Sequence, residues 1–131
     1  MNSRMRAAQL LVLVVIALPA LAHHSFSAEF DEKATTTLTG AVTKVEWFNP
    51  HIWVYLDVKD AGGKPQHWQC EGGAPNSLVR NGWTKNSLKQ GDEITIDGYL
   101  AKDGSKTCNA RKVTLADGKS VFAGSSAPTA K

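Results

Sequence analysis

The pair His23-His24 is the feature of this sequence with the clearest chemical potential. It follows Ala20-Leu21-Ala22 directly, and this small-x-small string is typical of a signal-peptide cleavage site. Cleavage after Ala22 makes His23 the first residue, and its free amine and imidazole together form a chelator suited to copper. Cleavage after Leu21 would leave a histidine third from the amine, which also chelates copper, but leucine is a poor residue at that position.

Residues 1–22 have the three parts of a secretory signal peptide. Arg4 and Arg6 precede an apolar run from Leu10 to Leu18, and the cleavage string follows it. A bilayer span needs about 20 apolar residues, so this run is too short, although an uncleaved anchor is the alternative. The sequence therefore predicts a periplasmic or secreted protein with no membrane span after cleavage.

Two further histidines could complete a copper site that begins at His23. The candidate metal ligands are His23, His24, His51 and His67. We expect the His23 amine and imidazole to act with one imidazole from His51 or His67, a nitrogen-rich set that suits Cu(II) and for which zinc could compete. The alternative is that the terminal histidines fray in solvent and that His51 only makes a hydrogen bond in a turn.

Charge and composition argue against several other functions. Loss of Arg4 and Arg6 with the leader reduces Lys plus Arg from 15 to 13, against 12 Asp plus Glu, and these charges alternate along the chain. Nucleic-acid binding needs a basic surface, which is absent from this pattern. No serine elbow and no glycine loop opening a helix are present, so we expect no enzymatic activity.

The elements that must position these histidines are mainly β-strands. The alternation of apolar residues and the turn signals predict strands over residues 37–47, 52–58, 66–71, 93–100, 107–115 and 120–123, with a short helix over 75–81. The apolar face of the first strand changes sides near Thr43, which predicts a bulge. Three strands, a helix and two or three strands indicate an all-β, OB-fold-like barrel over 37–123. Residues 23–36 form an N-terminal arm, and 124–131 a disordered tail.

Cys70 and Cys108 are the two cysteines of the chain, and they fall on the third and fifth predicted strands. These strands are neighbours in an OB fold, and the predicted compartment is oxidising, so a disulfide is favoured. A redox-active pair or a thiolate metal site is the alternative. The cysteines lack the C-x-x-C spacing that is typical of redox sites.

A second functional hypothesis is a metal-free binding face. Trp53 and Tyr55 alternate with the apolar residues of the second strand and are expected to point outward. The candidate ligand-binding residues are Asn49, Trp53, Tyr55, Gln69 and Glu71. This is the face on which OB folds commonly bind ligands, so a small ligand or an envelope protein is the expected partner. Alternatively, Phe26 and Phe30 of the arm cover this face and make it part of the core.

Several strings of the chain resemble a known family. They are His23-His24-Ser25-Phe26, the stretch from Val45 to His51 containing Asn49-Pro50-His51, the stretch Glu71 to Asn76, and Gly82-Trp83. Together they are similar to a family of short exported bacterial proteins that is catalogued as a domain of unknown function. The resemblance spans nearly all of the chain after the leader. It implies export and one compact domain, and it implies no activity.

Overall fold

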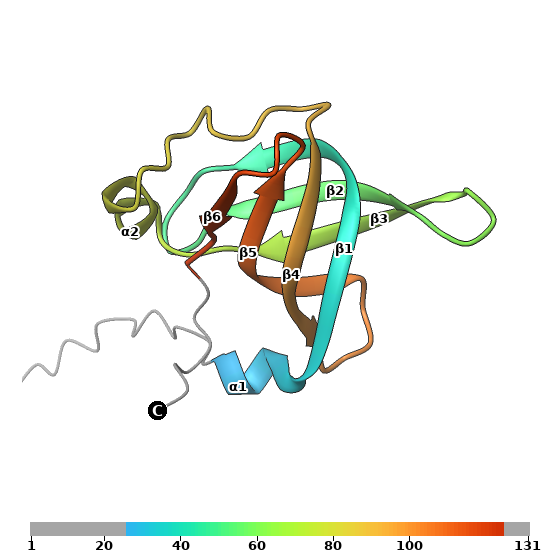
Figure 1. Ribbon diagram of the computed structural model, residues 1–131. Helices are drawn as coiled ribbons and strands as arrows, with labels where there is room; N and C mark the ends of the chain where they lie inside the picture. The colour runs from blue at the N-terminus through green and yellow to red at the C-terminus, as the bar shows by residue number, and fades with distance from the viewer. Residues whose placement is uncertain (1–25, 125–131) are drawn as a thin grey trace, which may run out of the picture.

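The computed structural model describes residues 26–124, which form six strands and two short helices (Figure 1). In chain order these elements are α1 (Phe26–Glu29), β1 (Phe30–Glu46), β2 (Trp53–Lys59), β3 (Pro65–Glu71), α2 (Pro75–Arg80), β4 (Glu93–Ala101), β5 (Thr107–Leu115) and β6 (Ser120–Phe122). No helix within residues 26–124 is long and apolar enough to cross a membrane.

Five of the strands form a ring. The sheet order is β3-β2-β1-β4-β5-β6, and a further pairing of β3 with β5 closes the first five strands of this order into the ring. The β3–β5 contact is parallel and has three paired positions, whereas the other strand pairs are antiparallel. We call this contact the β3–β5 seam. The predicted all-β, OB-fold-like class is confirmed, although the short seam and the addition of β6 outside the ring make the barrel irregular.

The long strand β1 pairs with two partners because it changes direction in the middle. Its first part pairs with β4 and its second part with β2, and the register shifts between Val42 and Lys44. The predicted bulge near Thr43 is therefore confirmed. A Cβ atom at Gly40 would lie 2.1 Å from the main-chain oxygen of Asp57, so only glycine allows β1 and β2 to approach this closely.

The first strand begins earlier than its sequence pattern indicates. Residues 30–36, which the sequence assigns to an arm, belong to β1, and Phe30 pairs with Ala101 of β4. The polar run Asp31 to Lys33 conceals this strand because it has no alternation of apolar residues. The register shift between Phe30 and Thr35 shows that the pairing is irregular here.

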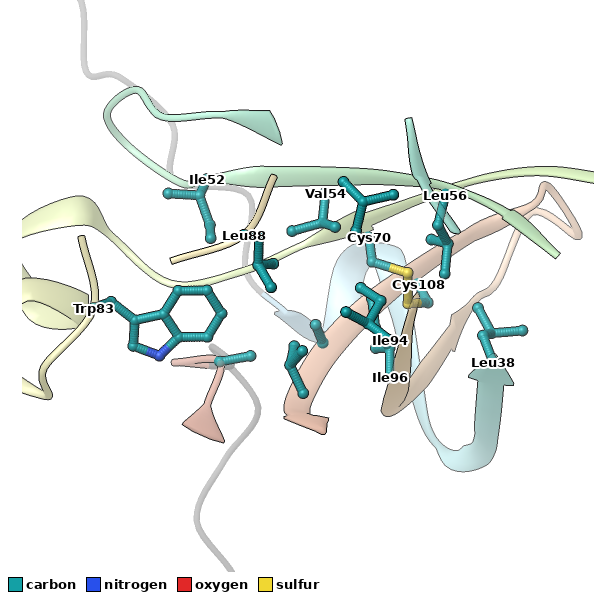
Figure 2. Packing of buried hydrophobic residues seen from close by; sticks show 14 of the residues in the cluster. Leu38, Ile52, Val54, Leu56, Cys70, Trp83, Leu88, Ile94, Ile96 and Cys108 are labelled. Atoms are coloured by element: carbon teal, nitrogen blue, oxygen red, sulfur yellow. A yellow bond between two sulfur atoms is a disulfide. The ribbon is translucent and has the colours of Figure 1, made fainter. Parts of the chain in front are cut away.

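The ring encloses one hydrophobic core, which includes alternate residues of β2 and β4 such as Val54, Leu56 and Ile96. Its buried members are Leu38, Val42, Ile52, Val54, Leu56, Cys70, Leu78, Trp83, Leu88, Ile94, Ile96, Cys108, Ala110, Val113 and Ala123. Figure 2 shows Cys70 and Cys108 bonded among these side chains. The predicted disulfide is confirmed, with a Cα–Cα distance of 4.5 Å.

The helix α2 covers one end of the core. Leu78 is fully buried, and the helix ends before Gly82, whose φ of +87° is a conformation that favours glycine. The amide of Trp83 then donates to the Leu78 carbonyl over 3.0 Å, which turns the indole back onto the core. Trp83 is 3% exposed, so it contributes to packing.

Candidate functional site

The strands β2, β3, β5 and β4 carry two rows of side chains on the outside of the ring, which we call the outer face. One row runs across Tyr55, Gln69 and Thr107, which are paired in the strand register. The other row runs across Trp53, Glu71, Asn109 and Tyr99. These positions alternate with the inward-facing cysteines, so the predicted grouping of Trp53 and Tyr55 with Gln69 and Glu71 occurs in the structure.

Tyr55 is held in place by its neighbours on β1. Its hydroxyl donates to Glu46 Oε2 over 3.0 Å, and Lys44 forms an ion pair with the same carboxylate. The hydrogen bond from Lys44 lowers the pKa of Glu46, with a further contribution from Tyr55. Burial and the bond to Glu46 raise the pKa of Tyr55, so the phenol stays protonated at neutral pH. The ring therefore has a fixed orientation, with the Lys44 ammonium 5.1 Å from its centroid.

The floor of the outer face beside Tyr55 is polar and hollowed. Gln69 Nε2 donates to Thr107 Oγ1 over 3.1 Å. Two surface hollows, of about 640 and 280 Å³, are both lined by Gln69, Ser105 and Thr107, and we call them together the trough. The larger one is also lined by Ala28, Glu29, Phe30, Ala101, Lys102 and Asp103, and the smaller one by Tyr55, His67, Trp68 and Lys106.

His51 lies beside Glu71 at the end of β3. Its Nδ1 is 3.1 Å from the Gly72 carbonyl oxygen and 3.6 Å from Glu71 Oε1. When Nδ1 carries the proton and donates to the carbonyl, the lone pair is on Nε2. Glu71 is 7% exposed, although it lies on the outside of the ring. The His51 ring, 23% exposed, is accessible in part.

His67 is at a different place on β3. It pairs with Asp57 in the register, and its Nδ1 bonds to the Asp57 carboxylate. The side chain is 84% exposed, which confirms that it points away from the interior. Glu71 lies four residue steps further along the strand, or about 13 Å away. His51 and His67 therefore do not share one site, and residues 26–124 contain no cluster of three or more His, Cys, Asp or Glu able to hold a metal ion.

The candidate ligands His23 and His24 lie outside the described residues. The described chain begins at α1, which is fixed against β4. Phe26 is 7% exposed and packs on Phe30 and edge-on against Tyr99, with ring centroids 5.6 and 5.3 Å apart. The Lys102 amide and ammonium donate to the carbonyls of Glu29 and Ser27, respectively. Phe26 and Phe30 thus bury the region around Tyr99, whereas Trp53 and Tyr55 stay partly exposed.

Asn49, the remaining candidate ligand residue, lies in the loop between β1 and β2. It is exposed and precedes a cis peptide bond to Pro50. It does not belong to the lining of the trough. The loop instead carries His51, two residues before β2 begins.

Some residues of the outer face were not anticipated from the sequence. Thr107 and Asn109 flank Cys108, just as Gln69 and Glu71 flank Cys70. The predicted disulfide contained this information, because pairing the two cysteines also pairs their neighbours. Asn109 is fully buried. The Glu46 contact to Tyr55 was not anticipated either, because it depends on the register between β1 and β2 beyond the bulge.

The fold and this outer face define an all-β protein with an OB-like ring of five strands. The sequence profile of a family of unknown function (DUF6152) matches residues 10–110. The chain therefore belongs to that family, as the resemblance of its sequence strings indicated. No curated protein matches the sequence.

Proposed function

We propose that the protein is an exported, non-enzymatic binding protein that holds Cu(II) between its processed N-terminus and His51. The observation that supports this most directly is the position of His51. Its Nδ1 faces the Gly72 carbonyl and the Glu71 carboxylate, and its Nε2 is the nitrogen that remains for a metal. Histidine ligands of metals usually have this arrangement, with the second nitrogen held by a carbonyl or carboxylate.

The chain length between His23 and the described residues permits this pairing. Phe26 contacts Tyr99, which lies in the same row of the outer face as Asn109 and Glu71. Two inter-strand steps separate Tyr99 from Glu71, or about 10 Å. Three extended residues also span up to about 10 Å, so a chain that left Phe26 toward Glu71 would be long enough to bring the amine and imidazole of His23 near the Glu71–His51 pair.

The chemistry of this set favours Cu(II). An amine and two imidazoles supply three nitrogen ligands, and Glu71 can provide a carboxylate oxygen or orient His51. Zinc accepts the same ligands and would compete. His67 is not required, because it lies at the other end of the β2–β3 pair. His24 is next to His23 in the sequence, and the proposed Cu(II) site does not require it as a ligand.

Export is the second part of the proposal. The residues before His23 have the features of a secretory signal peptide, and the Cys70–Cys108 disulfide is typical of periplasmic or secreted proteins. Cleavage after Ala22 is what would create the free amine on His23. Copper binding and export therefore depend on the same processing step.

The test combines mass spectrometry with Cu(II) titration of the exported protein. We expect a mass that begins at His23 and one tight Cu(II) site. Insertion of three alanines before His23, which moves both histidines beyond the third position from the amine, or His51→Gln, should weaken binding at least tenfold, which corresponds to about 1.4 kcal/mol. The matched control is His67→Gln, which removes an exposed histidine outside the site and should leave binding unchanged.

The affinity should also depend on pH. Cu(II) needs the imidazole and the amine without their protons, so binding should weaken steeply below about pH 6, where histidine becomes protonated. Equal Cu(II) affinity of the processed protein and the alanine-insertion variant would refute the role of the N-terminal amine. A different cleavage site would refute it as well, because no free amine would exist on His23.

A second candidate function is metal-free binding of a small ligand or an envelope protein on the outer face. It is supported by the partly exposed rings of Trp53 and Tyr55 beside the polar row of Gln69 and Thr107. OB folds commonly use this region for ligands. The two functions use different residues, so the same protein can have both.

A further inference from the structure

We propose that the trough binds a neutral glycan chain, with the Tyr55 ring as a stacking surface and the Gln69–Thr107 pair as its polar floor. This inference deepens the second candidate function and does not depend on copper. The trough runs from Tyr55 on β2, across β3 and β5, to α1 and the loop between β4 and β5. Its two hollows share Gln69, Ser105 and Thr107 in their linings, so they lie next to each other.

The Tyr55 hydroxyl is already bonded and the Lys44 ammonium lies over one face of the ring, so the rest of the ring is the part that remains for a ligand. The hydroxyl donates to Glu46, and Lys44 on β1 forms an ion pair with the same carboxylate. The ring is partly exposed and lines the smaller hollow. A ring fixed before binding loses little conformational freedom when a ligand packs on it. Sugar rings have an apolar face of C–H groups that packs flat on such a surface, with hydroxyl groups around its rim.

The floor of the trough matches those hydroxyl groups. The Gln69 amide and the Thr107 hydroxyl can both donate and accept hydrogen bonds, as alcohols do, whereas the Ser105 hydroxyl donates to Asp103 and keeps its acceptor capacity. The Gln69–Thr107 bond of 3.1 Å uses one amide proton and leaves the amide oxygen as an acceptor that this bond does not use. Uncharged groups of this kind select a ligand by its hydroxyl pattern, at little cost in desolvation.

The charges around the trough favour a neutral ligand. Two carboxylates, Glu29 and Asp103, are balanced by two lysines, Lys102 and Lys106. Bonds from Ser105 lower the pKa of Asp103, so this carboxylate is ionised at neutral pH. The Lys102 ammonium donates to the Ser27 carbonyl. A nucleic acid strand would need an excess of positive charge along its path, which these residues do not supply.

The size of the trough indicates a chain rather than a single sugar. Two inter-strand steps from Tyr55 to Thr107 cover about 10 Å, and the larger hollow continues beyond Thr107 to Ala101 and Ala28. Its volume of about 640 Å³ is within the range of small-ligand sites. Because the trough lies open on the surface, a ligand chain would lie across the strands and could extend beyond both ends of the trough.

The test is an NMR titration of the ¹⁵N-labelled processed protein in EDTA, with chitotetraose, cellotetraose and maltotetraose as probes. We expect at least one to bind saturably, with amide shifts centred on Gln69, Ser105 and Thr107. Tyr55→Leu should weaken that binding at least tenfold, whereas Tyr55→Phe, which keeps the ring, should change it less than about threefold. Phe48→Ala is the control, because Phe48 is 68% exposed in the β1–β2 loop and does not line the trough.

Three results would overturn the inference. The first is that none of the three tetrasaccharides shifts trough amides at millimolar concentration. The second is glycan binding that Tyr55→Leu leaves unchanged while circular dichroism shows that the variant is folded. The third is preferential binding of a peptide or of single-stranded DNA in the trough. A peptide that binds in the trough would refute the glycan proposal but would still support the second candidate function. Because EDTA removes copper, neither result depends on the copper test.

Discussion

The Cys70–Cys108 disulfide should supply a large part of the stability of this domain. It joins residues that are 38 positions apart, and both are fully buried in the core. In the chain-entropy description, a cross-link over a loop of this length removes freedom from the unfolded chain worth about 4 kcal/mol at 25 °C. Domains of this size have total stabilities of roughly 5–15 kcal/mol, so the reduced protein should be only marginally folded.

The assay is urea unfolding of the oxidised protein, of the same protein after reduction, and of the Cys70→Ala/Cys108→Ala variant. Reduction changes no atoms except the cross-link and its two hydrogens, so it isolates the effect of the loop. The double variant also removes buried sulfur atoms and should lose further stability, on the order of 1 kcal/mol. Because the double variant has no disulfide at all, it also shows the loss of stability if chemical reduction of the natural protein is incomplete.

The expected loss on reduction is about 4 kcal/mol, with a fall in Tm of roughly 16–32 °C. The denaturant slope m should rise, because the unfolded chain without the cross-link exposes more surface. A reduced protein within about 1 kcal/mol of the oxidised one, with an unchanged m, would show that the loop-entropy argument is wrong. In that case the disulfide would be a consequence of the fold and not a support for it.

Three further substitutions, the first with a matched control, test individual contacts of the fold. Gly40→Ala places a Cβ 2.1 Å from a main-chain oxygen of β2 and should cost about 3 kcal/mol in urea unfolding, whereas Gly62→Ala, where the nearest atom is 3.4 Å away, should be nearly neutral. Thr37→Val removes the hydroxyl that donates to Asp97 over 2.7 Å, the main cause of the lowered pKa of that carboxyl. A lowered pKa stabilises the fold above the unfolded value of 3.8, and this gain is lost as pH falls through the folded value. Thr37→Val should therefore lose about 1 kcal/mol of unfolding free energy at pH 7 and clearly less near pH 2. An equal loss at both pH values would refute the assignment. Trp83→Ala empties the end of the core under α2 and should cost about 3–5 kcal/mol, measured by thermal unfolding; a loss below about 1 kcal/mol would contradict its structural role.

The strands and their inward faces were predictable because their physics is local. Val54 and Leu56 alternate with Trp53 and Tyr55, and this period of two fixes which side is buried wherever one face meets a core. The turn residues gave the boundaries to within a few positions. The two cysteines added the one long-range constraint, since an OB-like order already placed their strands side by side.

The features that escaped prediction depend on contacts between distant segments. Residues 30–36 form a strand because β4 lies alongside, and their own polar sequence does not show it. Glu71 occupies an outward position, yet it is buried beside His51, and alternation alone cannot indicate such burial. His51 and His67 were candidates for one site. Their separation follows from the register, which places His67 opposite Asp57.

The closure of the ring determines how the molecule can open. Each of the five ring strands has a neighbour on both sides, so none can detach without breaking two sets of hydrogen bonds, whereas β6 is bonded in the sheet only to β5 (Figure 1). Opening should therefore be local at β6 and all-or-none in the ring. In hydrogen exchange, the amides of β6 should exchange early. The amides of Cys70 and Cys108 should exchange only as fast as the whole domain unfolds, so their protection reports the global free energy of unfolding.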